Sequence, residues 1–112
     1  MSAGNGNGHA WVSTTARWSC PEGNVYVTIA RTPEGQLRRV WVTVGKAGTA
    51  LYAAGDALGA VARLALDSGV PLDQLVRYLR GISHADYNRL AHEAMSMSDA
   101  LGRTLEWEVS AT

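Results

Sequence analysis

The segment from Gly45 to Thr49, Gly-Lys-Ala-Gly-Thr, combines residue types that can bind an anion. It follows a run of alternating valines and precedes a helical pattern. Free backbone N–H groups at a helix start would therefore lie beside the ammonium group of Lys46 and a capping hydroxyl on Thr49. The phosphate loops of nucleotide hydrolases differ, because their Lys is followed directly by Ser or Thr. We predict a nucleotide or phosphate site formed by Gly45, Lys46, Gly48 and Thr49. The alternative is that the glycines only allow a sharp turn and a close approach of the helix to the sheet.

Cys20 and His84 are the residues that could bind a metal ion. His84 and His92 are eight residues apart, whereas two zinc-binding histidines on one helical face are four apart. Cys20 and His84 could meet in space, but two ligands do not complete a tetrahedral zinc site, and Met97 is a poor third ligand. We therefore expect no cofactor, and zinc at Cys20 and His84 is the alternative.

No group of residues in the sequence is typical of catalysis. An enzyme of this size needs a nucleophile with a base, paired carboxylates or a metal ion. Cys20 is followed by Pro-Glu-Gly, and Arg17 is the one neighbour whose charge would stabilise a thiolate. A buried, unreactive thiol is the commoner state of a single cysteine. We therefore expect that the chain is not an enzyme on its own.

Length and composition predict one domain over residues 10–112, preceded by a small, polar and glycine-rich stretch over residues 1–9 that we expect to be flexible. Ten Lys plus Arg against ten Asp plus Glu give a formal net charge of zero, so nothing in the overall charge attracts nucleic acid or anionic lipid. The single cysteine suits a reducing compartment, and no apolar run resembles a membrane span or a signal peptide. We expect a cytoplasmic protein without a membrane partner.

Alternating apolar residues predict an antiparallel hairpin formed by residues 24–31 and 37–44. Its apolar face consists of Val25, Val27, Ile29, Val40, Val42 and Val44. A first strand within residues 10–18 is indicated by β-branched and aromatic residues. Because a two-stranded ribbon is marginal alone, helices must cover the valine face. The predicted fold class is α+β, an antiparallel β-hairpin or a small sheet of three to four strands packed on one face by three to four helices.

The first predicted helix follows the Gly45–Thr49 segment and ends at Gly69. The apolar stripe that we expect to face the sheet consists of Leu51, Ala54, Leu58, Val61 and Ala65. Gly55 and Gly59 would weaken an isolated helix, so they indicate close packing against a strand or a partner.

Three further helices are predicted after Gly69. One runs from Pro71 to Gly81. A capping box of Ser83 and Asp86 predicts the next over about residues 84–95. Ser98 is the candidate cap of a last helix over residues 99–107, and residues 107–109 are an alternative extended segment.

Tyr26 and Trp41 are predicted on the face of the hairpin opposite the valines, where Trp11 and Trp18 could join them. This is more aromatic surface than a solvated face requires. Three explanations stay open: another segment of the chain covers the face, two copies of the chain meet there, or bases stack on it.

Several motifs, taken in order, resemble the TSCPD domain. They are Cys-Pro-Glu-Gly-Asn-Val-Tyr-Val-Thr-Ile from Cys20, Val-Trp-Val-Thr-Val-Gly-Lys-Ala-Gly-Thr from Val40, Ala-Leu-Gly-Ala-Val-Ala-Arg-Leu-Ala-Leu-Asp-Ser-Gly-Val-Pro-Leu from Ala57, and Leu-Arg-Gly-Ile from Leu79. The domain is found near the carboxy terminus of adenosylcobalamin-dependent (class II) ribonucleotide reductases and in shorter stand-alone proteins. The resemblance covers about Trp18 to Glu106.

The chain departs from this family at two cysteine positions. Ser83-His84 stands where the family tends to have cysteine after Gly-Ile, and Ser96-Met-Ser-Asp-Ala100 stands where the family has Ser-Cys-Pro-Asp-Ala. Cys20 alone matches. If the family cysteines bind metal or exchange thiols, Met97 removes one of them and His84 could keep only a metal ligand.

The resemblance implies a small non-catalytic binding or accessory protein related to ribonucleotide reductase, since the radical chemistry belongs to a much larger domain. We expect a nucleotide or phosphate-bearing ligand at the Gly45–Thr49 segment and a reductase or host protein as a partner. The alternative is a homo-oligomeric or protein-interaction module, encoded by a phage or mobile element, that uses Tyr26 and Trp41.

Overall fold

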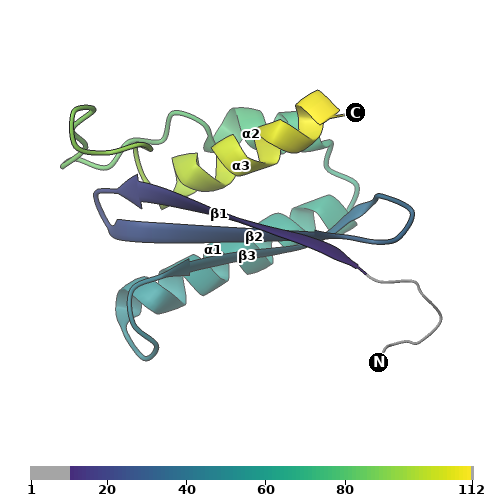
Figure 1. The fold of residues 1–112 in the computed structure, drawn as a ribbon, viewed down its shortest axis with the longest axis horizontal. Helices are drawn as coiled ribbons and strands as arrows, with labels where there is room; N and C mark the ends of the chain where they lie inside the picture. The colour runs from purple at the N-terminus through teal and green to yellow at the C-terminus, as the bar shows by residue number, and fades with distance from the viewer. Residues whose placement is uncertain (1–10, 112) are drawn as a thin grey trace.

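The computed structural model describes residues 11–111 as an α+β fold in which one face of a three-stranded sheet is covered by helices (Figure 1). The strands are β1 (Val12–Cys20), β2 (Gly23–Arg31) and β3 (Leu37–Val44), and the helices are α1 (Ala50–Asp67), α2 (Leu72–Leu79) and α3 (Met97–Ala111). The predicted fold class is confirmed. The stretch over residues 1–9 lies outside the described residues.

The sheet is antiparallel, with the order β1-β2-β3. Val25, Val27 and Ile29 of β2 are paired with Val44, Val42 and Val40 of β3, so six apolar side chains form one continuous buried surface. The predicted hairpin is therefore confirmed. The first strand also exists, and it extends to Cys20 because β1 is paired with β2 along its whole length.

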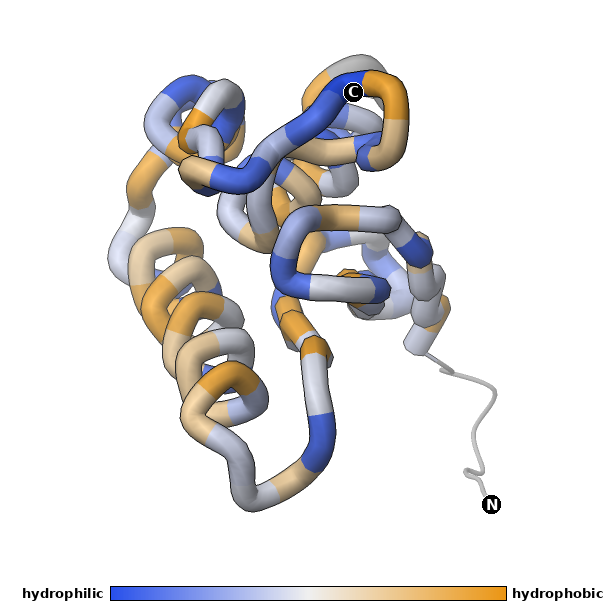
Figure 2. Tube along the Cα trace, turned by 90° about the vertical axis from the view of Figure 1, so that its left-hand side faces the viewer, coloured by the Kyte–Doolittle hydropathy of each residue, from blue (hydrophilic) through white to orange (hydrophobic). Residues whose placement is uncertain are grey.

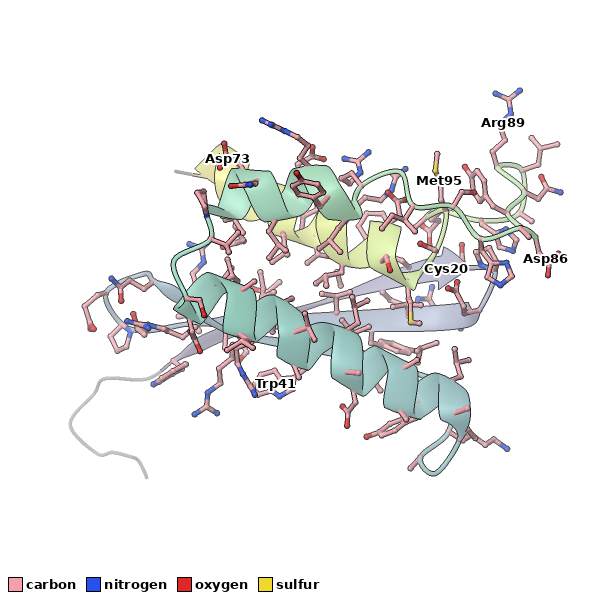
Figure 3. All side chains as sticks on the ribbon, turned by 180° about the vertical axis from the view of Figure 1, so that it is seen from behind. Cys20, Trp41, Asp73, Asp86, Arg89 and Met95 are labelled. Atoms are coloured by element: carbon pink, nitrogen blue, oxygen red, sulfur yellow. The ribbon has the colours of Figure 1, made fainter. Side chains whose placement is uncertain are left out.

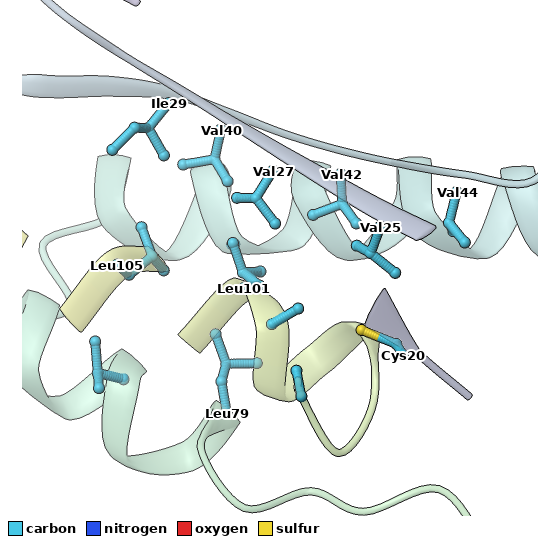
Figure 4. Close-up of a cluster of buried hydrophobic side chains, with 14 residues drawn as sticks. Cys20, Val25, Val27, Ile29, Val40, Val42, Val44, Leu79, Leu101 and Leu105 are labelled. Carbon is cyan, nitrogen blue, oxygen red and sulfur yellow. The ribbon is translucent and has the colours of Figure 1, made fainter. Parts of the chain in front are cut away.

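Helices α1 and α3 cover the valine face from two sides. Figure 4 shows the side chains of Val25, Val27, Val40 and Val42 pointing toward Leu101 and Leu105 of α3. Helix α1 lies along β3, and α2 packs on α3 rather than on the sheet (Figure 1). No helix in the described part of the chain is long and apolar enough to cross a membrane.

Helix α1 approaches β3 through glycine, and this corrects the predicted helix face. Gly55 and Gly59 are buried, and a Cβ on Gly59 would lie 3.1 Å from the nitrogen of Val42. Ala54 and Val61, which we expected to face the sheet, are exposed, although Leu51 and Leu58 do pack against the core. Contact between helix and strand backbones requires small residues at the centre of the contact, so glycine rather than the larger apolar residues sets the inner face. The glycines do not replace the hydrophobic residues of α1, which occur along the whole helix and not only on the side toward the sheet (Figure 2).

The helix predicted over residues 84–95 is wrong, because residues 81–96 form turns and bends without a helix. The capping box of Ser83 and Asp86 does not form; the N–H of Asp86 donates to Nδ1 of His84 at 3.0 Å instead. In the same way the N–H of Asn88 donates to Nδ1 of His92 at 3.0 Å. Polar side chains that bind nearby backbone groups compete with helix formation, and here they replace it.

The last helix begins earlier and ends later than predicted. Ser96, not Ser98, caps α3, because its Oγ accepts a hydrogen bond from the N–H of Asp99 at 3.1 Å. Residues 107–109 are helical rather than extended. Trp18 does not join the outer face: its Nε1–H donates to Oγ1 of Thr104 at 2.9 Å, and its ring packs on Trp107 at 5.6 Å between centroids.

The glycine contact leads to a prediction about stability. Gly55→Ala is expected to lower the free energy of unfolding by about 1 to 3 kcal/mol, since overpacking of a tight contact costs this much. The new Cβ would lie 2.9 Å from Cγ1 of Val44 and 3.0 Å from the carbonyl oxygen of Val42. Urea denaturation measures the change.

The matched control is Ala57→Gly at an exposed position of the same helix. It should lower the stability by about 1 kcal/mol through helix propensity alone. If Gly55→Ala proved as stable as the unchanged protein or more stable, the close approach of α1 to β3 would not be what requires glycine.

Candidate functional site

The segment from Gly45 to Thr49 forms the turn that was predicted between strand and helix. Gly45 and Gly48 have φ angles of +74° and +88°, a conformation that residues with a side chain rarely adopt. Thr49 caps α1: its Oγ1 accepts from the N–H of Tyr52 at 3.1 Å and donates to the carbonyl of Lys46 at 2.6 Å. The donor of the Thr49 hydroxyl is therefore already used within the turn.

Two kinds of group remain at this turn for an anion. The backbone N–H groups of Ala50 and Leu51, at the start of α1, make no hydrogen bond within the described residues. The ammonium group of Lys46 has no ion-pair partner there either. The residues from Gly45 to Ala50 are all exposed. The turn can thus meet a phosphate group from solvent with two N–H donors and one positive charge.

Cys20 is a buried thiol in the core and not a nucleophile. Its Sγ donates to the carbonyl of Ser96 at 3.6 Å. Burial, and then the nearby carboxylates of Glu22, Asp99 and Glu93, raise the pKa of the Cys20 thiol to about 12. The thiol therefore stays protonated near neutral pH, and the reactive thiolate is not formed.

The residues at the other family cysteine positions, His84 and Met97, make contacts of their own. Nδ1 of His84 accepts the N–H of Asp86, and Met97 packs against the apolar core. Within the part of the chain that the structure describes, no group of three or more His, Cys, Asp and Glu residues is placed to hold a metal ion. Figure 3 shows Cys20 directed into the interior, whereas Asp86 lies at the outer end of the loop.

The side chain of Asp99, which was not among the predicted site residues, is 0% exposed and accepts four hydrogen bonds. Its Oδ1 accepts from the N–H of Gly81 at 2.9 Å and from Nε of Arg80 at 3.2 Å. Its Oδ2 accepts from the N–H of Met95 at 2.9 Å and from Nε of Arg103 at 2.7 Å. The buried Asp99 carboxylate, which accepts four hydrogen bonds, thus joins three segments: the end of α2, the loop that precedes α3, and α3 itself.

These donors also decide the protonation state of Asp99. Burial alone would raise its pKa, but the hydrogen bonds from Arg103, Gly81 and Met95 outweigh burial, so the pKa is lowered. The sequence held a signal for this position. Ser96 and Asp99 have the same three-residue spacing as Ser83 and Asp86, and it is Ser96 with Asp99 that caps a helix.

Tyr26 and Trp41 lie on the outer face of the sheet, as predicted, and Trp11 joins them. All three are exposed, and the guanidinium carbon of Arg39 lies 4.6 Å from the ring centroid of Trp11 and 5.9 Å from that of Trp41. The described helices lie on the opposite face of the sheet (Figure 1). The structure thus separates the turn, the Asp99 cluster and the aromatic face into three regions.

Asp99→Asn is expected to lower the free energy of unfolding at neutral pH by about 3 kcal/mol, because the negative charge is lost and the amide nitrogen cannot accept the two hydrogen bonds made to the oxygen that it replaces. The lowered pKa adds a pH dependence. The Asp99 contribution is complete above the unfolded-state value near 3.8 and is lost as the pH falls through the lower folded-state pKa. Urea denaturation at pH 7 and at several values below pH 4 measures both effects.

The variant should therefore lose less stability between pH 4 and pH 2 than the unchanged protein. Asp56→Asn, an exposed aspartate of α1, serves as the control and should change neither quantity. An unchanged acid dependence in Asp99→Asn would show that other carboxylates carry the acid sensitivity.

Comparison with known proteins gives one match. A family model of the TSCPD domain matches residues 6–109, nearly the whole chain. No curated protein and no solved structure matches it. The matched range includes Cys20, the turn at Gly45–Thr49 and the buried Asp99. The family model implies a small domain associated with ribonucleotide reductase. The chain belongs to the TSCPD domain family.

Proposed function

We propose that the chain is a small, non-catalytic accessory protein of ribonucleotide reduction that binds a nucleotide or another phosphate-bearing ligand at the Gly45–Thr49 turn. The observation that carries the proposal is the exposed start of α1. There two backbone N–H groups without a hydrogen-bond partner in the described part of the chain lie close in the sequence to Lys46, which has no ion-pair partner in that part either. Family membership supplies the link to ribonucleotide reduction.

The turn favours an anion over a neutral ligand. The N-terminus of α1 carries partial positive charge from the aligned peptide groups, and its first turn contains no acidic residue that would oppose an anion. Lys46 adds a full charge on a flexible side chain. A phosphate group would bind in place of water at the N–H groups of Ala50 and Leu51.

The exposure of the turn sets the strength of the interaction that we propose. Because the residues from Gly45 to Ala50 are open to solvent, the attraction between Lys46 and a phosphate group is screened by salt. The affinity should therefore fall as the ionic strength rises. The base of a nucleotide would have to contact residues beside the turn, and Tyr52, which is half-buried in the first turn of α1, is the nearest aromatic side chain in the sequence.

A role without catalysis is supported by the state of Cys20. Its thiol is buried and has a raised pKa, so neither nucleophilic attack nor thiol exchange can start from a thiolate at this position. We assign the turn a binding role, in which the chain presents or senses a ligand for a partner enzyme.

Lys46→Ala is expected to weaken the binding of ATP about tenfold or more, since a hydrogen bond between charged groups contributes this much. Isothermal titration calorimetry with ATP and with inorganic phosphate, at low and at moderate salt, measures the change. Arg77→Ala, which removes an exposed positive charge from α2, is the matched control and should leave the affinity unchanged.

If ATP and inorganic phosphate both fail to bind at low salt, the turn is not an anion site. If they bind equally well to Lys46→Ala, the site lies elsewhere on the chain. Native mass spectrometry of the protein purified from its own cells would then show whether a reductase subunit co-purifies, which tests the accessory role separately.

A further inference from the structure

The outer face of the sheet, called the open face below, is the largest feature that the proposed function does not use. It consists of the outward strand positions Ser13, Thr15, Arg17 and Ser19 of β1, Asn24, Tyr26, Thr28 and Ala30 of β2, and Arg39, Trp41 and Thr43 of β3, with Trp11 just before β1. Helices α1 and α3 lie on the other side of the sheet (Figures 1 and 4). No described helix covers the open face.

Three aromatic side chains stand on this face. Trp11 is 44% exposed, Tyr26 41% and Trp41 38%. Because Thr28 is paired with Trp41 and lies two residues after Tyr26, the rings of Tyr26 and Trp41 occupy diagonal neighbouring positions on adjacent strands. Large aromatic side chains with this much exposure on one face indicate a binding surface.

Small residues form the floor between the aromatic side chains. Thr15 and Thr28 face each other across β1 and β2, with their hydroxyl groups 2.9 Å apart. Ser13 and Ala30 are paired in the next row of the sheet. The floor is therefore shallow, and a flat ring that stacks on Tyr26 or Trp41 would meet no large side chain there.

The charged residues at the outward strand positions have one sign. They are Arg17 and Arg39, and none of the ten Asp and Glu residues of the sequence occupies such a position. At the border of the face, the carboxylate of Glu93 accepts a hydrogen bond from the N–H of Ser19 at 2.9 Å. Neither arginine has an ion-pair partner within the described residues, whereas Arg31 and Arg103 each have one and Arg80 has two. Beside the face, at the edge of β3, Asp56 and Arg63 line a cavity of about 220 Å³ together with Trp41, so their charges balance.

Arg39 is held in place for an anionic partner. Its guanidinium group is stacked near the rings of Trp11 and Trp41, which fixes the side chain, and its N–H donors have no partner among residues 11–111. A planar guanidinium group without a carboxylate partner is well suited to bind phosphate.

A second copy of the chain fits this face poorly. In a twofold contact the same surface patch meets itself, so Arg17 and Arg39 would face outward strand positions that carry arginines and no carboxylate; the carboxylates of Glu93 and Asp56 lie only at the borders of the patch. A partner that supplies both flat rings and negative charge fits better. Single-stranded nucleic acid supplies both, because its bases stack on aromatic side chains and its phosphates bind arginine.

We propose that the open face binds single-stranded nucleic acid, with bases stacked on Tyr26 and Trp41 and the phosphate backbone bound by Arg39 and Arg17. The zero net charge of the chain does not oppose this, since the acidic residues are segregated to the helices, the loops and the strand connections. Two arginines make the affinity modest and strongly dependent on salt. The site is separate from the Gly45–Thr49 turn and does not rest on its function.

Fluorescence anisotropy with a labelled oligothymidylate of about 16 nucleotides, titrated at low salt and then at rising salt, tests the proposal. We expect binding, and we expect Tyr26→Ala and Trp41→Ala each to weaken it about tenfold through loss of a stacked base. Arg39→Gln should also weaken it and should reduce the slope of log K against log salt by about 0.7, the contribution of one phosphate.

The matched controls carry the same substitutions away from the open face. Tyr78→Ala and Arg77→Ala alter exposed residues of α2 and should leave the affinity unchanged. Lys46→Ala should also leave it unchanged, which keeps this site distinct from the proposed nucleotide site. Circular dichroism of each variant confirms the fold; if Trp41→Ala does not fold, Tyr26→Ala and Arg39→Gln decide.

Three results would overturn the proposal. One is the absence of any anisotropy change at low salt. Another is an equal loss of affinity in the α2 controls. The last is a dimer, seen by analytical ultracentrifugation without nucleic acid, that Tyr26→Ala and Arg39→Gln both dissociate; it would assign the face to a second copy of the chain.

Discussion

The buried carboxylate of Asp99 is the interaction on which the arrangement of the carboxy-terminal half depends. It accepts hydrogen bonds from the N–H groups of Gly81 and Met95, which lie at the two ends of the irregular loop over residues 81–96. Ser96 adds a bond from its hydroxyl to the carbonyl of Ile82. A loop with no helix of its own is thereby closed at its base by the side chains of Asp99 and Ser96, together with a backbone hydrogen bond from the N–H of His84 to the carbonyl of Met95. Because the charge is matched by two arginines and two N–H groups, its burial is tolerated without loss of ionisation.

The two halves of the structure are attached to the sheet in different ways. Helix α1 packs against β3 through glycine, so backbone lies almost directly on backbone. Helix α3 packs through Leu101 and Leu105, whose side chains fill the space over β1 and β2 (Figure 4). The first contact depends on the absence of side chains and the second on their volume. The five valines and the isoleucine of β2 and β3 all point to this one side, which leaves the other side of the sheet mostly to polar and aromatic residues.

The sequence was sufficient to predict the elements whose signals are local. Alternating valines predicted β2 and β3, and the glycines with Thr49 predicted the turn and the start of α1, because a period of two and a cap are read within a few residues. The close packing of Gly55 and Gly59 was also predicted, and their contact with β3 confirms it. Ala54 and Val61 were wrongly placed on the same face, since which residues flank that contact is a tertiary property. The loop around His84 was read as a helix from the spacing of Ser83 and Asp86. The hydrogen bonds from the backbone to the side chains of His84 and His92, which replace this helix, leave no pattern in the sequence.

The candidate sites divide in the same way. The turn at Lys46 and the outward positions of Tyr26 and Trp41 were predicted from spacing, whereas the part played by Asp99 depends on donors that come from 18 and 19 residues before it in the chain. No local pattern brings Gly81 and Arg80 to Asp99. The Ser96 and Asp99 spacing gave a signal, but the same spacing at Ser83 and Asp86 had no structural consequence of this kind.

The place of Trp11 has a practical consequence for work on this protein. Trp11 lies against Arg39 at one corner of the open face, so whatever is joined to the amino-terminal side of Trp11 starts beside that surface. A fluorescent label attached at Trp11 itself would share the surface with any ligand. Affinity reagents are therefore better attached at the carboxy terminus, beyond α3, on the helical side of the molecule (Figure 1).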